Sequence, residues 1–435
     1  MSVVDRSGSG SVESGSGLGV ACVFAAGLVL WGLASARLTR WNITAPLAFV
    51  AWGVVMIGVL GISHVGAGSS AVREIAEFAL ALVLFSDAAR VNVRSLRRDA
   101  GVPGRLLGIG LPLTIGLGIA AALLCFTSLD PWVAAVIGAA LAPTDAALGA
   151  VVVEDERVPV RIRRALNVES GLNDGLATPF VTFFIVGAVE ATQVVVHQHA
   201  SEAVVDLVVG VLVGVAVGVA GGWLLGRERR TGWAGESFVP IAILGLAVLA
   251  FTGARELDVN GFVAAFAGGL AFGAVNREAP ERAEQSMAFV ALGGELLSLL
   301  LWFLFGAFLI DVLDAAPTGT VVYAVLSLTV VRMVPVAIAC IGSRLHPSTV
   351  AFVGWFGPRG LASVVFGLLA FDDLGADGSG EIVLGAVAAT VLASVVLHGL
   401  TAGPFSARYS RRAAALADDR PEHVDVPVIP TRRIG

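Results

Sequence analysis

Lysine is missing from this chain of 435 residues, because all 28 basic residues are arginine. Arginine does not lose its proton in proteins, so no amine that gains and loses charge is available inside the fold. Charge is scarce as well: 14% of the residues are charged, against about a quarter in a typical soluble domain. Since 56% are hydrophobic and the mean hydropathy is +0.86, a water-soluble globule is excluded and a polytopic membrane protein is expected.

Cysteine is also rare. Cys22, Cys125 and Cys340 each lie in an apolar run without a CxxC partner, so we interpret them as small buried residues rather than disulfide or metal ligands. HExxH, GxSxG and GxGD patterns are missing, which disfavours an intramembrane enzyme. We therefore expect a protein that is not an enzyme and needs no cofactor.

Apolar windows of about 20 residues recur and predict thirteen membrane helices in a transmembrane domain over 18–404. A Ser/Gly-rich segment, 1–17, precedes them as a flexible tail, and a short polar tail, 405–435, follows. The predicted fold class is an all-α polytopic membrane protein. The helices are predicted at 18–36, 43–63, 71–89, 105–127, 130–152, 165–189, 203–225, 236–253, 259–275, 286–311, 317–342, 349–371 and 381–404.

Arginines in the loops are distributed unequally between the two sides of the membrane. The loops after odd-numbered predicted helices and the C-terminal tail hold nearly all of them, whereas the other side holds only Arg6, Arg73 and Arg255. The positive-inside rule then predicts an outer N-terminus and a cytoplasmic C-terminus. Arg332 and Arg359 remain, and because both lie within predicted spans, a functional partner is expected for each.

Two predicted helices, the fifth and the twelfth, are interrupted by proline and carry opposite charges. Thr144 and Asp145 follow Pro143 in one, and Arg359 follows Pro358 in the other. Their order along the chain makes them cross the membrane in opposite directions, which is typical of an inverted-repeat transporter with two crossed discontinuous helices. At such a crossing we expect Asp145 to offset positive helix N-termini and Arg359 to offset negative C-termini. Which ends meet stays open.

The sixth predicted helix holds the densest polar cluster. At 100° per residue, Ser170 and Asp174 share one stripe, whereas Glu169 and Asn173 share the next. Glu169 and Asp174 therefore point about 140° apart, which suggests different roles. We expect Glu169 to pair with Arg332 and Asp174 to bind the transported ion.

Oxygen atoms are the ligands that a hard monovalent cation prefers. The predicted Na⁺ ligands are the Asp174 carboxylate, the hydroxyls of Ser170 and Thr144, and carbonyls freed by Pro143. Desolvation favours the protonated form of a carboxylate, so one buried acid can hold either a proton or a cation. Exchange would then follow from competition at Asp174.

At these residues the chain resembles the monovalent cation:proton antiporter-1 family, prokaryotic relatives of the eukaryotic sodium/proton exchangers. The matching segments are APTDAALG at 142–149, VPVRIRRALNVESGLNDGLATP at 158–179, VVRMVP at 330–335 and GPRGLAS at 357–363. One small departure is Thr144-Asp145-Ala146, where the family has TDP.

This resemblance implies a sodium (or lithium)/proton antiporter of the cell membrane that contributes to pH homeostasis. It implies a homodimer in which a core, about 105–189 and 317–404, moves against an interface domain, about 18–89 and 203–311. The roles it implies are Asp174 as the ion-binding carboxylate with Asn173 beside it, Thr144 and Ser170 as further ligands, Glu169 with Arg332 as a structural ion pair, and Asp145 with Arg359 at the helix crossing.

Stoichiometry also follows in part from the sequence. Electrogenic relatives are similar but carry Asp-Asp in place of Asn173-Asp174, and a buried lysine at the position of Arg332. With one titrating carboxylate in the pair and no lysine, we expect one-for-one, electroneutral exchange.

Several alternatives remain at this stage. A potassium/proton antiporter of the same fold is not distinguished by ligand types, and a cation channel is less favoured. The roles of Glu74, Glu77, Glu295 and the acidic loop 154–156 stay open, while Asp87 is interpreted as a local helix pair with Arg90.

Overall fold

The computed structural model describes residues 10–61, 66–91, 101–192, 200–276, 280–375, 378–417 and 420–424, which are helical with short connections and contain no strand. Seven of the described helices are long and apolar enough to cross a membrane. Large apolar side chains also face outward, such as Leu33 at 82% and Leu212 at 61% exposure. A polytopic membrane protein is confirmed, since lipid solvates such faces and water does not. Arg6, Arg94, Arg97, Arg98, Arg277, Arg432 and Arg433, used for the predicted orientation, lie outside the described residues.

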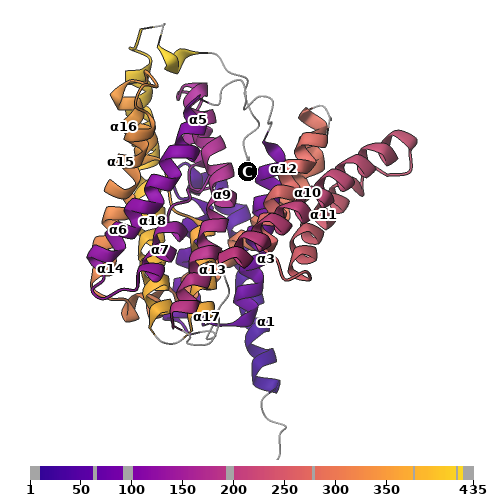
Figure 1. Ribbon diagram of the computed structural model, residues 1–435, viewed down its shortest axis with the longest axis horizontal. Coiled ribbons are helices and arrows are strands. Elements are labelled where there is room, and N and C mark those ends of the chain that lie inside the picture. Colours follow the sequence, from indigo (N-terminus) through magenta and orange to yellow (C-terminus); the bar gives the residue numbers. More distant parts are fainter. Residues whose placement is uncertain are drawn as a thin grey trace, which may run out of the picture.

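Each predicted helix coincides with one helical element or a consecutive set (Figure 1). In chain order these are α1 (Gly10–Thr39); α2 (Ala45–Gly53) with the π-helical turn η1 (Val54–Val59); α3 (Ser70–Arg90); α5 (Gly101–Arg105), η2 (Leu106–Gly110) and α6 (Leu111–Cys125); α7 (Pro131–Ala140) and α8 (Ala150–Val153); α9 (Val160–Thr192); α10 (Ala200–Thr231); α11 (Val239–Arg255); α12 (Gly261–Val275); α13 (Pro280–Ala315); α14 (Gly319–Leu328) and α15 (Val330–Ala339); α16 (Pro347–Trp355) and α17 (Leu361–Leu374); and α18 (Ser379–Ala413).

The ends of the chain differ from the expectation. Helix α1 begins at Gly10, inside the segment predicted as a tail, and α18 continues to Ala413. A short 3₁₀ turn, η3 (Pro421–His423), follows. Apolar windows detect only the part of a helix that lies in lipid, so polar helical turns beyond the bilayer are missed.

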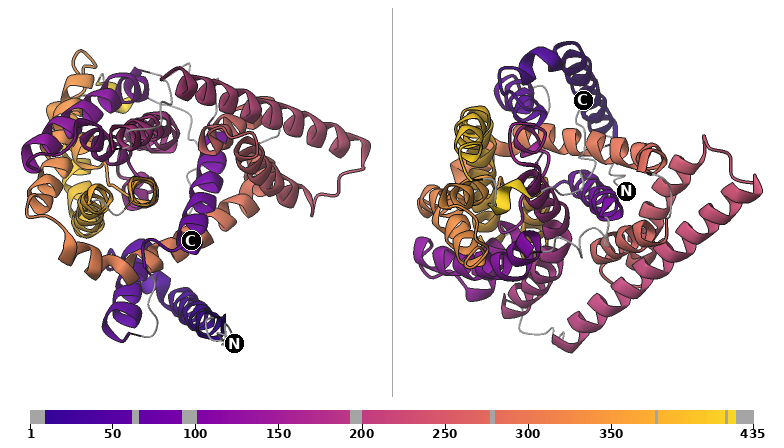
Figure 2. Two further views of the ribbon diagram at one scale, coloured as in Figure 1. Left: turned by 60° about the horizontal axis from the view of Figure 1, so that its bottom comes forward. Right: turned by 90° about the horizontal axis from the view of Figure 1, so that it is seen from above.

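The helices pack as two groups. Helices α10, α11 and α12 lie together with α3 and α13. Figure 2 shows the rose-coloured ribbons of α10 and α11 standing apart from the orange and yellow helices α14–α18. Helices α6, α7 and α9 pack with the latter set. Within the first group, Gly210, Gly214 and Gly218 recur every four residues on α10, and a Cβ at Gly214 or Gly218 would overlap backbone carbonyls of α12. Glycines at this spacing allow close backbone approach, as in other membrane helices.

Both interruptions expected from the sequence are present. Non-helical chain separates α7 from α8 and α16 from α17. At the crossing the two non-helical segments join, because the backbone N–H of Asp145 donates to the carbonyl of Pro358 at 2.8 Å. Crossed discontinuous helices in an all-α membrane fold are thereby confirmed.

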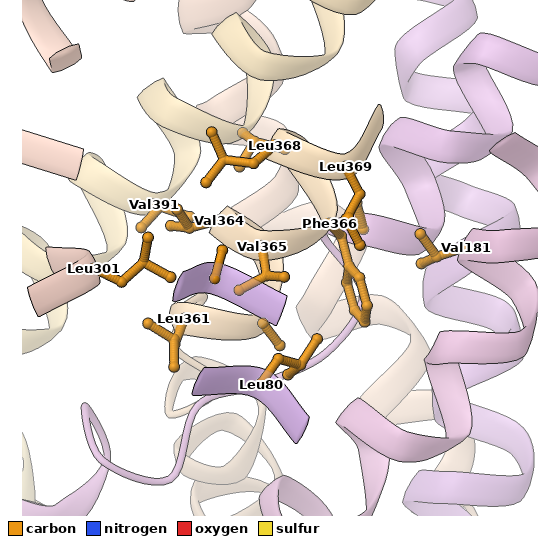
Figure 3. Packing of buried hydrophobic residues seen from close by; sticks show 14 of the residues in the cluster. Leu80, Val181, Leu301, Leu361, Val364, Val365, Phe366, Leu368, Leu369 and Val391 are labelled. Carbon is orange, nitrogen blue, oxygen red and sulfur yellow. The ribbon is translucent and has the colours of Figure 1, made fainter. Parts of the chain in front are cut away.

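Buried apolar side chains fill the space between the two groups on one side of this crossing. In Figure 3, Leu80 of α3 lies near Leu361 and Val365 of α17, with Leu301 of α13 and Val391 of α18 nearby. Each of these five is at most 6% exposed. This packing closes the region between α3 and α17.

Candidate functional site

An ion pair joins α9 to α15. Arg332 donates from Nη1 to Glu169 Oε1 at 2.5 Å and from Nη2 to Oε2 at 3.0 Å, and both side chains are at most 5% exposed. Gly357 leaves room for the guanidinium, since a Cβ there would overlap it. Both Glu169 oxygens are therefore occupied, and the structure pairs the two charges that the sequence analysis matched.

Three side chains on α9 and the first interruption meet beside this pair. The hydroxyls of Thr144 and Ser170 lie 2.9 Å apart, and Asn173 Nδ2 donates to Thr144 Oγ1 at 2.7 Å. Because the Asn173 amide donates, Thr144 is fixed without introducing another charge. All three are buried, with Thr144 and Asn173 at 1% exposure.

Asp145 binds the positive ends of both interrupted helices. Its Oδ1 accepts from the backbone N–H groups of Ala147, at 2.7 Å, and Leu148, at 3.2 Å, just before α8. Its Oδ2 accepts from the N–H of Leu361, the first residue of α17, at 2.9 Å. Helix N-termini carry partial positive charge, so this carboxylate neutralises two of them at once. Gly360 makes the approach possible, since a Cβ there would overlap the Asp145 carboxyl.

Arg359 binds backbone carbonyls that lie just beyond the C-terminal end of α7. Its Nη1 donates to the carbonyls of Ala142 at 2.5 Å and Pro143 at 3.0 Å, and the side chain is fully buried. A cation at helix C-terminal carbonyls offsets their partial negative charge. The sequence left open which helix ends meet at the crossing, and these contacts answer that question.

His398 on α18 serves the C-terminal end of α16 and was missed in the sequence. The Arg359 N–H donates to Ser394 Oγ at 2.7 Å, Ser394 Oγ lies 3.2 Å from His398 Nδ1, and His398 Nε2 lies 2.9 Å from the carbonyl of Trp355. His398 Nδ1 also lies 2.9 Å from the carbonyl of Ser394, so each ring nitrogen is within hydrogen-bond distance of a backbone carbonyl. A lone histidine in an apolar helix gives no signal that would identify this role.

A cavity of about 40 Å³ lies at the crossing, large enough for a water molecule or a small cation. Asp174 and Ser170 line it from α9, and Asp145, Ala146 and Ala147 line it from the first interruption. Of the expected ligands, Asp174 and Ser170 therefore line the cavity directly, and Thr144 bonds to the hydroxyl of Ser170.

Two further acids line the same cavity from the other helix group. Asp87 comes from α3 and Glu295 from α13, together with Ser298 and Trp302. Spacing along the sequence predicts only a local pair of Asp87 with Arg90 and no role for Glu295. Which helix faces point at one another cannot be deduced from one-dimensional spacing, so this convergence was missed.

The remaining open acids lie elsewhere. Glu77, at 6% exposure, accepts from Arg73 and Arg255 and does not line the cavity. In the acidic loop, Asp155 accepts from Arg157 Nε and Nη2, each at 2.8 Å. That hydrogen-bonded guanidinium lowers the pKa of Asp155 below its ordinary value, so this carboxylate is a paired loop residue that stays ionised at neutral pH.

Comparison with protein families defines the class. Residues 15–408 match the family model for the sodium/hydrogen exchanger, transmembrane domain. This match spans most of the chain, so the chain belongs to the sodium/hydrogen exchanger family.

Solved structures give the same fold. The chain is similar to the sodium proton antiporter MjNhaP1 from Methanocaldococcus jannaschii at pH 8, with a TM-score of 0.72 and 19% identity over 90% of this chain and 98% of that one. An electron-microscopy map of MjNhaP1 gives a TM-score of 0.67 and 18% identity, covering 88% of this chain and 96% of that one.

Proposed function

We propose that this member of the family exchanges Na⁺ or Li⁺ for H⁺, one for one, with both ions competing for the Asp174 carboxylate. The observation that carries the proposal is the position of Asp174 in the cavity at the helix crossing, with Ser170 beside it. The hydroxyls of Ser170 and Thr144 supply neutral oxygens for a dehydrated Na⁺. The carbonyls of Ala142 and Pro143, which the sequence predicts as further ligands, accept from Arg359 instead.

Electroneutral exchange is supported by how the other buried charges are engaged. Glu169 gives both oxygens to Arg332, and Asp145 gives both to helix N-termini. Arginine keeps its proton, and Asn173 is neutral. The proposal assigns the gain of either one proton or one cation to Asp174 because Asp174 lines the cavity.

Asp87 and Glu295 have a different role in this proposal. They belong to the helix group that contains α3 and α13, so they do not travel with Asp174 when the core moves. Their negative charge attracts cations into the cavity without being carried across the membrane. They raise local Na⁺ concentration and leave the stoichiometry unchanged.

Movement of the core group against the group with α3, α10, α11, α12 and α13 would expose Asp174 to each side in turn. The arginine distribution supports a cytoplasmic C-terminus, and the chain is proposed to act as a homodimer in the cell membrane. Exchange there would link Na⁺ balance to pH homeostasis.

Proteoliposomes with an internal pH dye test the proposal. Na⁺ or Li⁺ is expected to release an imposed pH gradient at a rate that an imposed membrane potential does not change. A response to K⁺ alone would identify a potassium/proton antiporter, and currents far above carrier turnover would identify a channel. A potential-dependent rate would contradict one-for-one exchange.

Asp174→Asn is the decisive variant, and Asp155→Asn is its matched control because Asp155 pairs with Arg157 outside the cavity. Exchange should disappear in the first and persist in the second, while both elute as folded protein. Exchange that survives in Asp174→Asn would remove Asp174 from the mechanism.

A further inference from the structure

We propose that Arg73, Asp372 and Asp373 form an ion-pair latch between the two helix groups, which holds the protein in the state whose cavity opens to the arginine-rich face. The inference rests on the proposed alternating exposure of Asp174. Its test uses a readout that does not require ion exchange.

The contacts span the boundary between the two groups. Arg73, at the start of α3, donates from Nη1 to the carboxylate of Asp372 and to Asp373 Oδ1, the latter at 3.0 Å, at the end of α17. Its Nε donates to Glu77 Oε1 at 3.0 Å, and Arg255 of α11 donates to Glu77 Oε2 at 3.1 Å. The second pair connects α3 and α11 within one group, whereas the first connects that group to α17.

One stripe of α3 carries both the latch and the cavity wall. Arg73, Glu77, Leu80, Leu84 and Asp87 follow spacings of three or four residues, so they lie on one face of the helix. Leu80 and Asp87 line the cavity, and Leu80 and Leu84 are buried. The latch therefore lies at one end of the surface that faces the ion site.

Helix α17 presents the complementary stripe. Leu361, Val365, Leu368 and Asp372 follow the same spacing, from the cavity at Leu361 to the latch at Asp372. Figure 3 shows Leu361, Val365 and Leu368 among the packed side chains that include Leu80. Between the cavity and the latch the two helices are thus sealed by apolar side chains.

The cavity extends away from the latch. It is lined by Ala45 and Pro46 at the start of α2 and by Asp87 near the end of α3. These helix ends lie on the face that carries Arg37, Arg40 and Arg90, opposite to Arg73. The cavity lining therefore extends toward the arginine-rich face and not toward the latch, which is why the proposal takes the arginine-rich face as the open side.

Arg73 is an exception to the charge distribution. The side with few arginines holds Arg73 and Arg255 among its three, and both contact Glu77. An arginine on the side that the positive-inside rule disfavours is explained if its charge is needed there for an ion pair. The side chains of Arg73, Asp372 and Asp373 are 28%, 43% and 38% exposed, so these pairs are weak enough to open during each transport cycle.

A single cysteine reports whether the sealed surface opens. In a variant whose three native cysteines are replaced by alanine, Leu368→Cys is exposed to a membrane-impermeant maleimide added outside intact cells. Adding Asp372→Asn with Asp373→Asn is expected to raise the labelling rate about two- to fivefold, since loss of exposed pairs shifts the population by that order. Arg73→Gln should do the same.

Arg255→Gln is the matched control, because it removes a pair of the same network that does not connect the two groups. Labelling unchanged by the aspartate substitutions, or raised equally by Arg255→Gln, would overturn the latch. If the double variant does not elute as folded protein, Arg73→Gln alone decides.

A crosslink gives the converse test. Arg73→Cys with Asp373→Cys, in the cysteine-free background, should be joined by a short bifunctional thiol reagent with reducible linkages, which should stop Na⁺/H⁺ exchange until the linkages are reduced. Full exchange in the crosslinked protein would contradict the proposal. If the protein exchanges ions but the aspartate substitutions do not change the labelling of Leu368→Cys, only the latch is overturned. If those substitutions raise the labelling but the protein exchanges no ions, only the proposed function is overturned.

Discussion

The two interrupted helices cross at one point but contribute different chemistry. The first places Thr144 against Ser170 and Asn173, and its residues Asp145 to Ala147 line the cavity. The second contributes only Leu361 and Ala362 to the cavity lining, while its Arg359 is buried against the end of α7. The two interruptions are alike in architecture but differ in their contacts: the first lines more of the cavity, and the second holds the first in place through Arg359.

The N-terminal ends of α7 and α16, which lie away from the crossing, are also stabilised differently. Asp130 caps α7 locally by accepting from the N–H of Trp132 at 2.7 Å. The start of α16 is also capped locally, since His346 Nδ1 accepts from the N–H of Ser348 at 3.2 Å, but it has a distant carboxylate in addition: Glu422 accepts from the N–H of His346 and from Thr349 Oγ1, each at 2.7 Å. The second helix is thus stabilised by parts of the chain far away in sequence, which makes it the more sensitive to remote substitutions.

The largest effect is expected at Arg332, which supports the second interruption from α15. Arg332→Met leaves Glu169 charged and unpaired in the interior, which costs about 3–5 kcal/mol of folding stability. A strongly lowered thermal unfolding midpoint in detergent would show this. Adding Glu169→Gln should recover most of the loss, because the uncompensated charge is gone. Failure of the double variant to recover would mean that Arg332 acts mainly by packing.

A smaller loss of stability is expected from replacing a glycine at the second interruption than from Arg332→Met, and a still smaller one from replacing a glycine at the first. Gly360→Ala forces a methyl into the Asp145 carboxyl, so we expect about 1–3 kcal/mol of destabilisation and loss of exchange. Gly149→Ala, near the first interruption, meets its neighbours at 3.5 and 3.6 Å, which is ordinary contact, and should be tolerated. Parallel unfolding and exchange assays compare the two. Equal sensitivity would show that the second interruption is no more tightly packed than the first.

Much of the fold follows from the sequence, because lipid imposes a simple pattern. Apolar length predicts the spans, and proline with charge at mid-span predicts both interruptions. Which residues of the two crossing segments touch cannot be predicted in this way. Gly360 lies against Asp145 because of how two segments cross, and nothing in the spacing of either segment contains that information.

The same limit applies to the site. Acids on one helix, such as Glu169 and Asp174, could be assigned different directions from helical periodicity alone. Asp87, Glu295 and His398 could not, because their partners lie on other helices and each residue is isolated in an apolar run. Single-sequence reasoning finds clusters that are local and misses those that form only by packing.

Removing a hydroxyl near the first interruption should weaken Na⁺ binding, whereas removing one near the second should not. Thr144→Val removes a proposed ligand and the acceptor of Asn173, so the half-saturating Na⁺ concentration should rise about three- to tenfold, the equivalent of one hydrogen bond. Thr144→Ser should restore it. Ser363→Ala, a buried hydroxyl on α17, is the control and should leave it unchanged. A similar rise in both would show that the first interruption has no special role in binding.

The smallest effect concerns the caps of the two interrupted helices. Burial would raise the pKa of Glu422, but the hydrogen bonds from His346 and Thr349 outweigh it and lower that pKa from 4.5. A carboxyl whose pKa is lower in the folded state stabilises fully above its unfolded value and loses this contribution as pH falls through the folded value. Glu422→Gln should therefore cost about 0.3–1 kcal/mol at neutral pH, the range for a charge at a helix N-terminus, with the difference shrinking below about pH 4.5.

Thermal unfolding of the wild type and Glu422→Gln from pH 3.5 to 8 measures this difference, with Asp130→Asn as the matched substitution at the cap of α7. A stability difference for Glu422→Gln that stays constant down to pH 3.5 would show that the glutamate acts by shape rather than by charge. In that case the distant carboxylate would be a packing contact, and the two caps would differ in distance along the chain but not in electrostatics.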